Sequence, residues 1–299
     1  MTLTQTPRKP SSRETADEPV AGSRSSPQRR FLRHVVLTAI GLVMMYPLLW
    51  LISSSIKPSN KVFIDEGLWP KQFDFTNYAR GWTALNDTFT VYFTNSLIIV
   101  TLSIVGNLLS CSLAAFAFAR LQFIGRRLFF AIMLGTLMLP AHVLVIPRYV
   151  LFDKLGWLNT YFPLLVPHFL ATNGFYIFLM VQFMRGLPND QDDAARIDGC
   201  GPFRTFWKVI MPLCLPAFAT TAIFTFIAVW NEFFEPLLYL TDPQLYTVPL
   251  ALRQFMDSEG QSQWGEMFAM SFVSLAPVIG FFIAGQKYLV KGIATTGLR

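Results

Sequence analysis

Six long stretches without a single charged residue constrain this 299-residue chain more than any other feature. Each stretch holds at least 20 residues, and a helix of that length crosses the hydrocarbon core of a bilayer. In lipid, an isolated apolar segment satisfies its backbone hydrogen bonds only as a helix. The sequence therefore predicts an all-α, polytopic membrane protein with six transmembrane helices. The stretches are 35–56, 91–119, 128–147, 160–184, 209–231 and 267–286.

The distribution of basic residues predicts the orientation. If the N-terminus is cytoplasmic, 17 of the 24 Lys and Arg residues fall in segments on the cytoplasmic side, as the positive-inside rule requires. Both termini are therefore expected in the cytoplasm. The net charge of +6 lies beside the ends of spans rather than along one stripe, so it indicates topology and not nucleic-acid binding.

Three parts of the chain are predicted from these patterns. Residues 1–34 are rich in Ser, Pro, Thr and Arg without apolar periodicity, which is typical of a disordered basic cytoplasmic tail. Residues 35–290 form the transmembrane domain, and residues 291–299 form a cytoplasmic C-terminal tail. The connection that reaches from the first span to about residue 90 is long enough to be partly structured.

The connection between the fourth and fifth spans, residues 185–208, is too long and too patterned for a simple turn. Asn189 or Asp190 is suited to begin a short helix, and carboxylates in the first turn are favoured by the helix dipole. Gly199 is suited to end it, and an amphipathic turn with Phe203, Phe206 and Trp207 follows. The alternative is a solvated helical hairpin whose charges only keep it soluble.

The segment 193–199, with Val209–Ile210–Met211–Pro212 nine residues further on, resembles the EAA motif of ABC importer permeases. The departures are Asp193 for Glu, Val209 for Ile and Met211 for Leu. Further stretches resemble the carbohydrate, maltose-type branch of this family: TNSL at 94–97, AAFAFARLQFIGRR at 114–127, IPRY at 146–149, WNEF at 230–233 and TVPLAL at 247–252.

The resemblance implies a permease subunit in the bacterial inner (plasma) membrane, paired with a second permease subunit to form a heterodimeric pore. Two copies of an ABC ATPase, which carry the ATP and Mg, would dock on a coupling helix of this chain, and an extracytoplasmic solute-binding protein would deliver a sugar or oligosaccharide. The residues expected to couple the ATPase are Asp192, Asp193, Ala194, Ala195, Arg196, Ile197, Asp198, Gly199 and Pro212.

The rival function classes lack their sequence signatures. No G-x-x-x-x-G-K-[ST] loop occurs, so ATP is expected to bind to a partner, and no cofactor or metal site is predicted in this chain. No span carries the chain of acidic groups that proton relays use, which disfavours an ion-coupled secondary transporter. A membrane enzyme would need a nucleophile with its base, or a metal set, and neither is present. Cys111, Cys200 and Cys214 show no ligand or disulfide spacing and are expected to be small buried or half-buried side chains.

Candidate pathway residues lie near the ends of two spans. Arg148 follows the third span and is either a contact for an acidic or hydroxyl-rich glycan or an anchor in the headgroups. A mixture of aromatic and polar side chains ends the fifth span and suits a sugar, although an interfacial belt has the same composition. Its members are Trp230, Asn231, Glu232 and Phe233. The roles of His142 and His168 stay open.

The connection 241–266 is longer than a minimal turn and carries more acidic than basic residues. By the resemblance, we expect it to touch the binding protein. The candidate contacts are Arg253, Gln254, Ser258 and Gln261. Neither the solute nor the share of each subunit in binding it follows from one chain, and another polar nutrient remains an alternative to a sugar.

Overall fold

The computed structural model describes residues 27–256 and 263–296, and its regular elements in these ranges are all helical. The chain divides into two compact units, residues 1–47 and 48–299, which are described separately. Helix α1, Pro27–Ser55, contains most of the first unit's described residues. It begins eight residues before the predicted span, so residues 27–34 are helical where a disordered tail was predicted. Proline is well tolerated in a first helical turn and arginine favours helix, which explains the longer helix.

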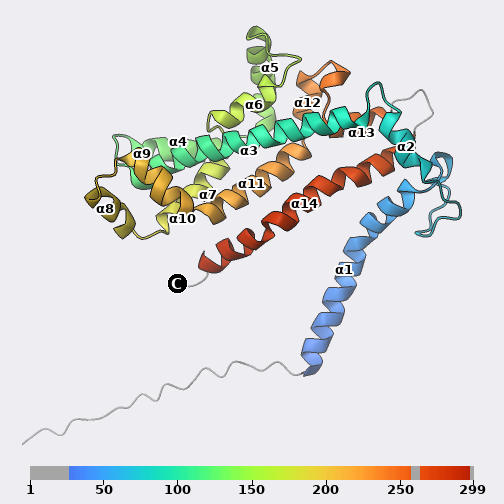
Figure 1. The fold of residues 1–299 in the computed structure, drawn as a ribbon, viewed down its shortest axis with the longest axis horizontal. Coiled ribbons are helices and arrows are strands. Elements are labelled where there is room, and N and C mark those ends of the chain that lie inside the picture. The colour runs from blue at the N-terminus through green and yellow to red at the C-terminus, as the bar shows by residue number, and fades with distance from the viewer. Residues whose placement is uncertain (1–26, 257–262, 297–299) are drawn as a thin grey trace, which may run out of the picture. The chain divides into compact units, whose positions relative to one another are not determined.

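The centre of the second unit is α3, Phe89–Arg120, a helix of 32 residues. It packs against α6, Phe162–Phe169, against α7, Gly174–Arg185, and against α11, Leu215–Trp230 (Figure 1). Gly106 allows one of these contacts, because a Cβ there would come within 2.9 Å of the Phe169 ring. Small residues at such crossings let helices approach closely where lipid offers no hydrophobic driving force.

Helix α14, Trp264–Thr296, packs against α11 and against α2, Thr76–Thr83. A Cβ on Gly285 would lie 2.5 Å from the Ile223 side chain, so this crossing also depends on a glycine. The helix continues to Thr296, so residues 291–296, which were predicted to form a tail, are helical.

The third, fourth and fifth of the six predicted spans are interrupted. The third, 128–147, consists of α4, Arg126–Thr136, a 3-10 turn η2, Ala141–Leu144, and the start of α5, Val145–Lys154. Pro140 precedes η2, and proline lacks an N–H and disfavours a helical residue before it, so one uninterrupted helix does not form. The fourth span is divided between α6 and α7, with residues 170–173 between them.

In the described ranges, four helical segments are long and apolar enough to cross a membrane, and a fifth counts if a bent pair is one span. The bent pair, Pro202–Leu213 and Leu215–Trp230, turns by 78°. It includes α9, Pro202–Thr205, the π-helical turn η3, Phe206–Ile210, and α10, Met211–Leu213, before α11. The four segments outside this pair are Phe31–Ser55, Phe89–Arg120, Phe162–Arg185, which includes the break between α6 and α7, and Trp264–Lys287. The all-helical, polytopic character is confirmed.

The connection between α1 and α3 is partly structured, as predicted, with η1, Ser59–Lys61, and α2. Lys57 is buried and donates to the carbonyl oxygens of Asp65 at 2.6 Å and Gly67 at 2.7 Å. Arg80 of α2 forms an ion pair with Glu266 of α14 at 2.9 Å. These bonds hold the connection to the start of α14, because a buried ammonium or carboxylate is stable only when its hydrogen bonds are satisfied.

The remaining short elements lie on either side of residue 240. They are α12, Phe234–Tyr239, η4, Pro243–Leu245, and α13, Val248–Gln254. Asn95 of α3 donates to the carbonyl oxygens of Gln244 at 2.8 Å and Tyr246 at 3.0 Å, which joins this region to the central helix.

Candidate functional site

The predicted short helix of the 185–208 connection is present as α8, Asp190–Ile197. Asp190, Asp192 and Asp193 occupy its first turn, where the helix dipole favours negative charge. Its end is closed by two backbone bonds, from Gly199 N–H to Arg196 O at 3.0 Å and from Cys200 N–H to Ala195 O at 2.8 Å. These bonds form a Schellman motif, and Gly199 supplies the positive φ, +74°, that the motif requires.

One face of α8 is turned away from the rest of the chain. Ala194 and Asp193 are exposed, and the side chain of Ile197 is 86% exposed. Ala195, by contrast, is buried against this chain's own residues, so only Ala194 of the alanine pair is open to a partner. An exposed isoleucine beside a small residue and a rim of charges is the composition of a protein-docking surface.

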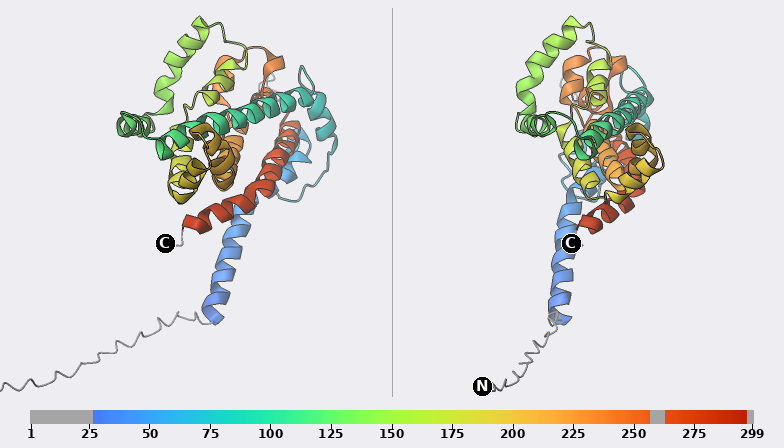
Figure 2. Two further views of the ribbon diagram at one scale, coloured as in Figure 1. Left: turned by 60° about the vertical axis from the view of Figure 1, so that its left-hand side comes forward. Right: turned by 90° about the vertical axis from the view of Figure 1, so that its left-hand side faces the viewer.

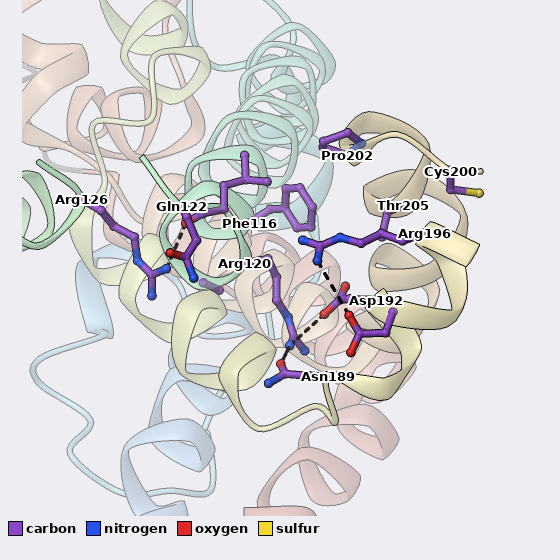
Figure 3. Close-up of a pocket in the computed structure, with 13 residues that line it drawn as sticks. Phe116, Arg120, Gln122, Arg126, Asn189, Asp192, Arg196, Cys200, Pro202 and Thr205 are labelled. Atoms are coloured by element: carbon purple, nitrogen blue, oxygen red, sulfur yellow. Dashed lines mark hydrogen bonds and ion pairs between the residues drawn. The ribbon is translucent and has the colours of Figure 1, made fainter. Parts of the chain in front are cut away.

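Arg120, the last residue of α3, holds the start of α8 in place (Figure 3). Its guanidinium forms an ion pair with Asp192 at 2.9 Å and donates to the Asn189 side-chain oxygen. It also donates to the backbone carbonyls of Met184 at 2.8 Å and Leu187 at 2.9 Å. The ends of α3 and α7 and the beginning of α8 are thus joined through one side chain.

These residues border a cavity of about 490 Å³ between the end of α3, α8 and α9. Figure 3 shows Arg120 and Asp192 directed toward each other across it, with Arg126 and Gln122 on the α3 side and Thr205 and Pro202 on the α9 side. Figure 2 shows α8 to α10, in yellow-brown, gathered at this end of α3. The cavity is polar on most sides, which fits a surface that receives a protein loop or solvent.

A second cavity of about 490 Å³ lies among α4–α7 and α12. Arg148 of α5 and Glu235 of α12 meet in it, with Nη1 and Oε1 3.3 Å apart. Burial raises the pKa of Glu235, and the nearby Arg148 partly opposes this increase. His168 and Tyr239 also line the cavity, so it combines charged donors and acceptors with an aromatic ring.

Residues 106–295 match the family model of the binding-protein-dependent transport system inner membrane component. This match covers more than half of the chain. The chain belongs to this family. It is therefore a multi-pass permease of the inner membrane and a transport component rather than an enzyme, as the sequence predicted.

Individual relatives cover nearly the whole permease. The trehalose/maltose transport system permease protein MalG of Thermococcus litoralis is 32% identical over 91% of this chain and 97% of its own. The diacetylchitobiose uptake system permease protein NgcG of Streptomyces coelicolor is 30% identical over 92% and 91% of the two chains. Among solved structures, a chain of a bacterial ABC transporter involved in the import of the acidic polysaccharide alginate superposes with a TM-score of 0.77 at 26% identity, covering 89% of this permease and 98% of that chain.

After α8, the predicted amphipathic turn of the permease is helical. Phe206 is buried against Phe116 of α3, with ring centroids 5.3 Å apart, whereas Phe203 is exposed. Pro212 is in the first turn of α10, which follows the π-helical turn η3 directly. This segment therefore connects α8 to α11 through a packed contact on α3.

The four consecutive residues predicted to line a pathway at the end of the fifth span do not share one environment. Trp230 is 3% exposed, and its Nε1 donates to Ser274 O at 3.2 Å, so the structure places it in the core. Glu232 accepts from the backbone N–H of Phe234 at 2.9 Å and of Glu235 at 3.2 Å at the start of α12. Asn231 is exposed and Phe233 is half-buried. None of the four is among the described lining residues of the Arg148 cavity.

Other predicted residues are placed as follows. Arg253 is exposed and Gln254 half-buried at the end of α13, whereas Ser258 and Gln261 lie outside the described residues. His142 contacts the Phe234 ring edge-on with centroids 5.8 Å apart, and His168 Nδ1 lies 3.3 Å from Asn107 Oδ1. The cysteines behave as predicted: Cys111 and Cys214 are buried and Cys200 is half-buried.

Sequence reasoning missed Arg120 and Glu235 as partners of predicted residues. A lone arginine at the end of an uncharged span is normally interpreted as a topology signal, as Arg120 was. The signal that could have been used was the position of the acidic residues. Asp192 and Glu235 each follow an apolar span, where the chain reaches the membrane interface. Only the fold shows which arginine each carboxylate meets.

Proposed function

We propose that this permease is the sugar or oligosaccharide subunit of an ATP-driven importer, with α8 as the helix on which a separate ATPase docks. The observation that carries this proposal is the exposed Ile197 on a helix whose other side is fastened to α3 and α7 by Arg120. Movement of a docked partner would then reach two spans through a short, buried connection.

The proposed docking surface consists of the residues named from the motif. Some of them would contact the ATPase, and others hold or end the helix. Asp193, Ala194, Ile197 and Asp198 present the contact face. Asp192 and Ala195 hold the helix to the chain, and Arg196 pairs with Asp193 at 3.8 Å on the exposed side. Gly199 ends the helix, and Pro212 begins the turn into the next span.

The proposed assembly follows the family pattern. This chain forms a heterodimeric pore with a second permease subunit, binds two copies of an ABC ATPase that hold the ATP and Mg, and receives its solute from an extracytoplasmic binding protein. We propose six spans with both termini in the cytoplasm, the interrupted α4–α5 region being the third. The six uncharged stretches and the charge asymmetry support this arrangement.

A sugar is favoured by the names of the two relatives, which are transport proteins for trehalose/maltose and for diacetylchitobiose. The Arg148 cavity agrees with this class, since guanidinium and carboxylate groups bind hydroxyls. Another polar nutrient would be carried by the same architecture. Screening glycans for an increase in the melting temperature of the binding protein separates the two, because a ligand that binds only the folded state stabilises it.

The docking proposal is tested by cysteine cross-linking in the complex purified from its native host through a tag on this chain. In a Cys200→Ser background, Ile197→Cys should cross-link to the ATPase subunit with a short bifunctional reagent. Ile64→Cys is the matched control, because it is another isoleucine with a similar exposed fraction in the α1–α3 connection. Equal cross-linking from both positions, or none from residue 197 in an intact complex, would refute the docking role.

A further inference from the structure

A third cavity, of about 950 Å³, lies between the beginning of α4 and the end of α7. Three arginines line it: Arg126, Arg127 and Arg185. The other lining residues are apolar, glycine or the neutral Gln122, so the described lining contains no carboxylate. Positive charge is thus concentrated in a hollow that lacks an internal counter-ion.

The three guanidinium groups differ from the permease's other cavity-lining arginines. Arg120 and Arg148 each meet a carboxylate of this chain. Arg126 donates to the Leu121 carbonyl at 2.9 Å, and Arg185 lies 4.9 Å from the centre of the Phe130 ring, but neither forms an ion pair with a described residue. Arg127 is exposed, and its side chain has no hydrogen-bond or ion-pair partner in the described part of the chain. The contact with the Phe130 ring holds the Arg185 guanidinium in place and leaves its N–H groups available to a ligand.

The surroundings of this cavity place it at a membrane boundary. It adjoins the ends of two candidate spans, Phe89–Arg120 and Phe162–Arg185, which Arg120 joins to each other. Large apolar side chains beside it are exposed, with Ile124 completely so, and Leu128 and Phe129 more than half exposed. Apolar residues that face lipid tails next to arginines at headgroup depth are the arrangement found where membrane proteins bind anionic lipids.

We propose that this cavity binds the phosphate of an anionic phospholipid, with Arg127 and Arg185 as its main ligands and Ile124, Leu128 and Phe129 against the acyl chains. A guanidinium donates two parallel hydrogen bonds to a phosphate, and two such groups would neutralise the headgroup. The site is separate from the ATPase-docking face and does not depend on which solute the permease carries.

The test uses the whole importer complex in nanodiscs of phosphatidylcholine with a minor fraction of phosphatidylglycerol, and measures retained lipid per complex by native mass spectrometry after delipidation. The wild type should retain phosphatidylglycerol preferentially. Each arginine near a charged surface strengthens binding about fivefold. Arg127→Gln should therefore weaken retention about fivefold, and Arg127→Gln/Arg185→Gln about 25-fold. Arg127→Lys should keep most of it.

Arg204→Gln is the matched control, an exposed arginine of α9 outside this cavity, and it should retain lipid as the wild type does. Arg127→Gln removes no hydrogen bond or ion pair within the described part of the chain. A loss of lipid in this variant would therefore not be expected to come from misfolding. The proposal is overturned if the wild type shows no preference for phosphatidylglycerol, or if Arg204→Gln loses as much lipid as Arg127→Gln. Displacement of the lipid by millimolar inorganic phosphate would assign the cavity to a free anion instead, and loss of the ATPase subunit with unchanged lipid would assign it to a protein partner.

Discussion

Two arginines of this permease each meet a carboxylate beside a cavity of about 490 Å³, yet their surroundings differ. The Arg120 side chain is 7% exposed, pairs with Asp192 at 2.9 Å, and has three further acceptors. The Arg148 side chain is 39% exposed and meets Glu235 at 3.3 Å, with no other hydrogen-bond acceptor among the described residues.

The Arg120–Asp192 pair is buried and fixed in place, whereas the Arg148–Glu235 pair is open enough to change partners. A buried guanidinium needs partners for most of its donors, and Arg120 has four acceptors, although its Nε has none in the described part of the chain. Arg120 therefore determines where α8 begins relative to α3 and α7. A half-exposed pair contributes little to stability and is able to exchange its partner for a solute or water. Under the proposed function, Arg120 is a positioning residue at the ATPase-docking end, and Arg148 lies where a substrate would compete for its charge.

The largest effect is expected from Arg120→Ala. Removing one member of a buried ion pair leaves the other uncompensated, which typically costs about 3–5 kcal/mol. We expect loss of the ATPase subunit from the purified complex and a lower unfolding temperature. Arg204→Ala serves as the control because Arg204 is exposed and forms no ion pair with a described residue. If Arg120→Ala kept both assembly and uptake, the anchor would be disproved.

The next effect tests the end of α8 without touching any ion pair. Gly199→Leu places a branched side chain at a φ of +74°, which costs on the order of 1–2 kcal/mol. No atom lies within 4 Å of the added Cβ, so the effect arises from backbone conformation and not from a clash. Membrane insertion should be normal while ATP hydrolysis is uncoupled from uptake.

Gly199→Asn is the control for this prediction, since asparagine tolerates the left-handed region better than leucine. It should retain most of the coupled uptake. Normal uptake by an intact Gly199→Leu complex would show that the end of α8 has no part in coupling.

A smaller effect, with opposite signs for the two partners, is expected at the Arg148–Glu235 pair. Arg148→Gln should slow uptake of an acidic glycan several-fold more than that of a neutral glycan of equal length, and Glu235→Gln should favour the acidic glycan. Since burial raises the pKa of Glu235, mildly acidic medium should move the wild type toward the Glu235→Gln behaviour. Uptake assays with both glycans at matched complex yield measure this, and equal slowing of both would leave Arg148 a structural or membrane anchor.

The smallest effect is expected at the more exposed Arg80, whose side chain is 51% exposed and pairs with Asp74 at 2.8 Å. The pKa of Asp74 is lowered, first by the Thr76 hydroxyl and also by Arg80. A lowered folded-state pKa adds stability above the unfolded value of about 3.9, and this stability is lost as the pH falls through the folded pKa.

For an exposed pair the contribution is about 0.2–1 kcal/mol. Asp74→Asn should therefore lower the unfolding temperature slightly at pH 7, and the difference from the wild type should shrink as the pH falls through the lowered pKa of Asp74. Thermal unfolding of the detergent-solubilised complex in a pH series from 7 to below this pKa measures both. A difference that persists at the lowest pH would mean that Asp74 acts through something other than its charge.

Local features of the structure were readable from the sequence. The uncharged runs determined that the fold is helical and membrane-spanning, because backbone groups in lipid can be satisfied only locally. The end of α8 followed from Gly199, since a positive φ depends on a few neighbouring residues. Asn189, which was expected to cap the start of the helix, makes no side-chain cap bond, and its side-chain oxygen accepts from Arg120 instead. The interruption of the third span at Pro140 is also local, because proline lacks an N–H and disfavours a helical residue before it.

The partners of the functional side chains were decided by tertiary structure alone. Arg120 meets carbonyls 64 and 67 residues away, and Arg148 meets a carboxylate 87 residues away. Trp230, predicted to face a pathway, is instead buried under α14, because the packing of α11 turned that side of the helix inward. Sequence determines what each segment can form within a few residues, whereas the contacts between distant segments depend on how helices pack, and that packing decides which charges are buried, paired or left open.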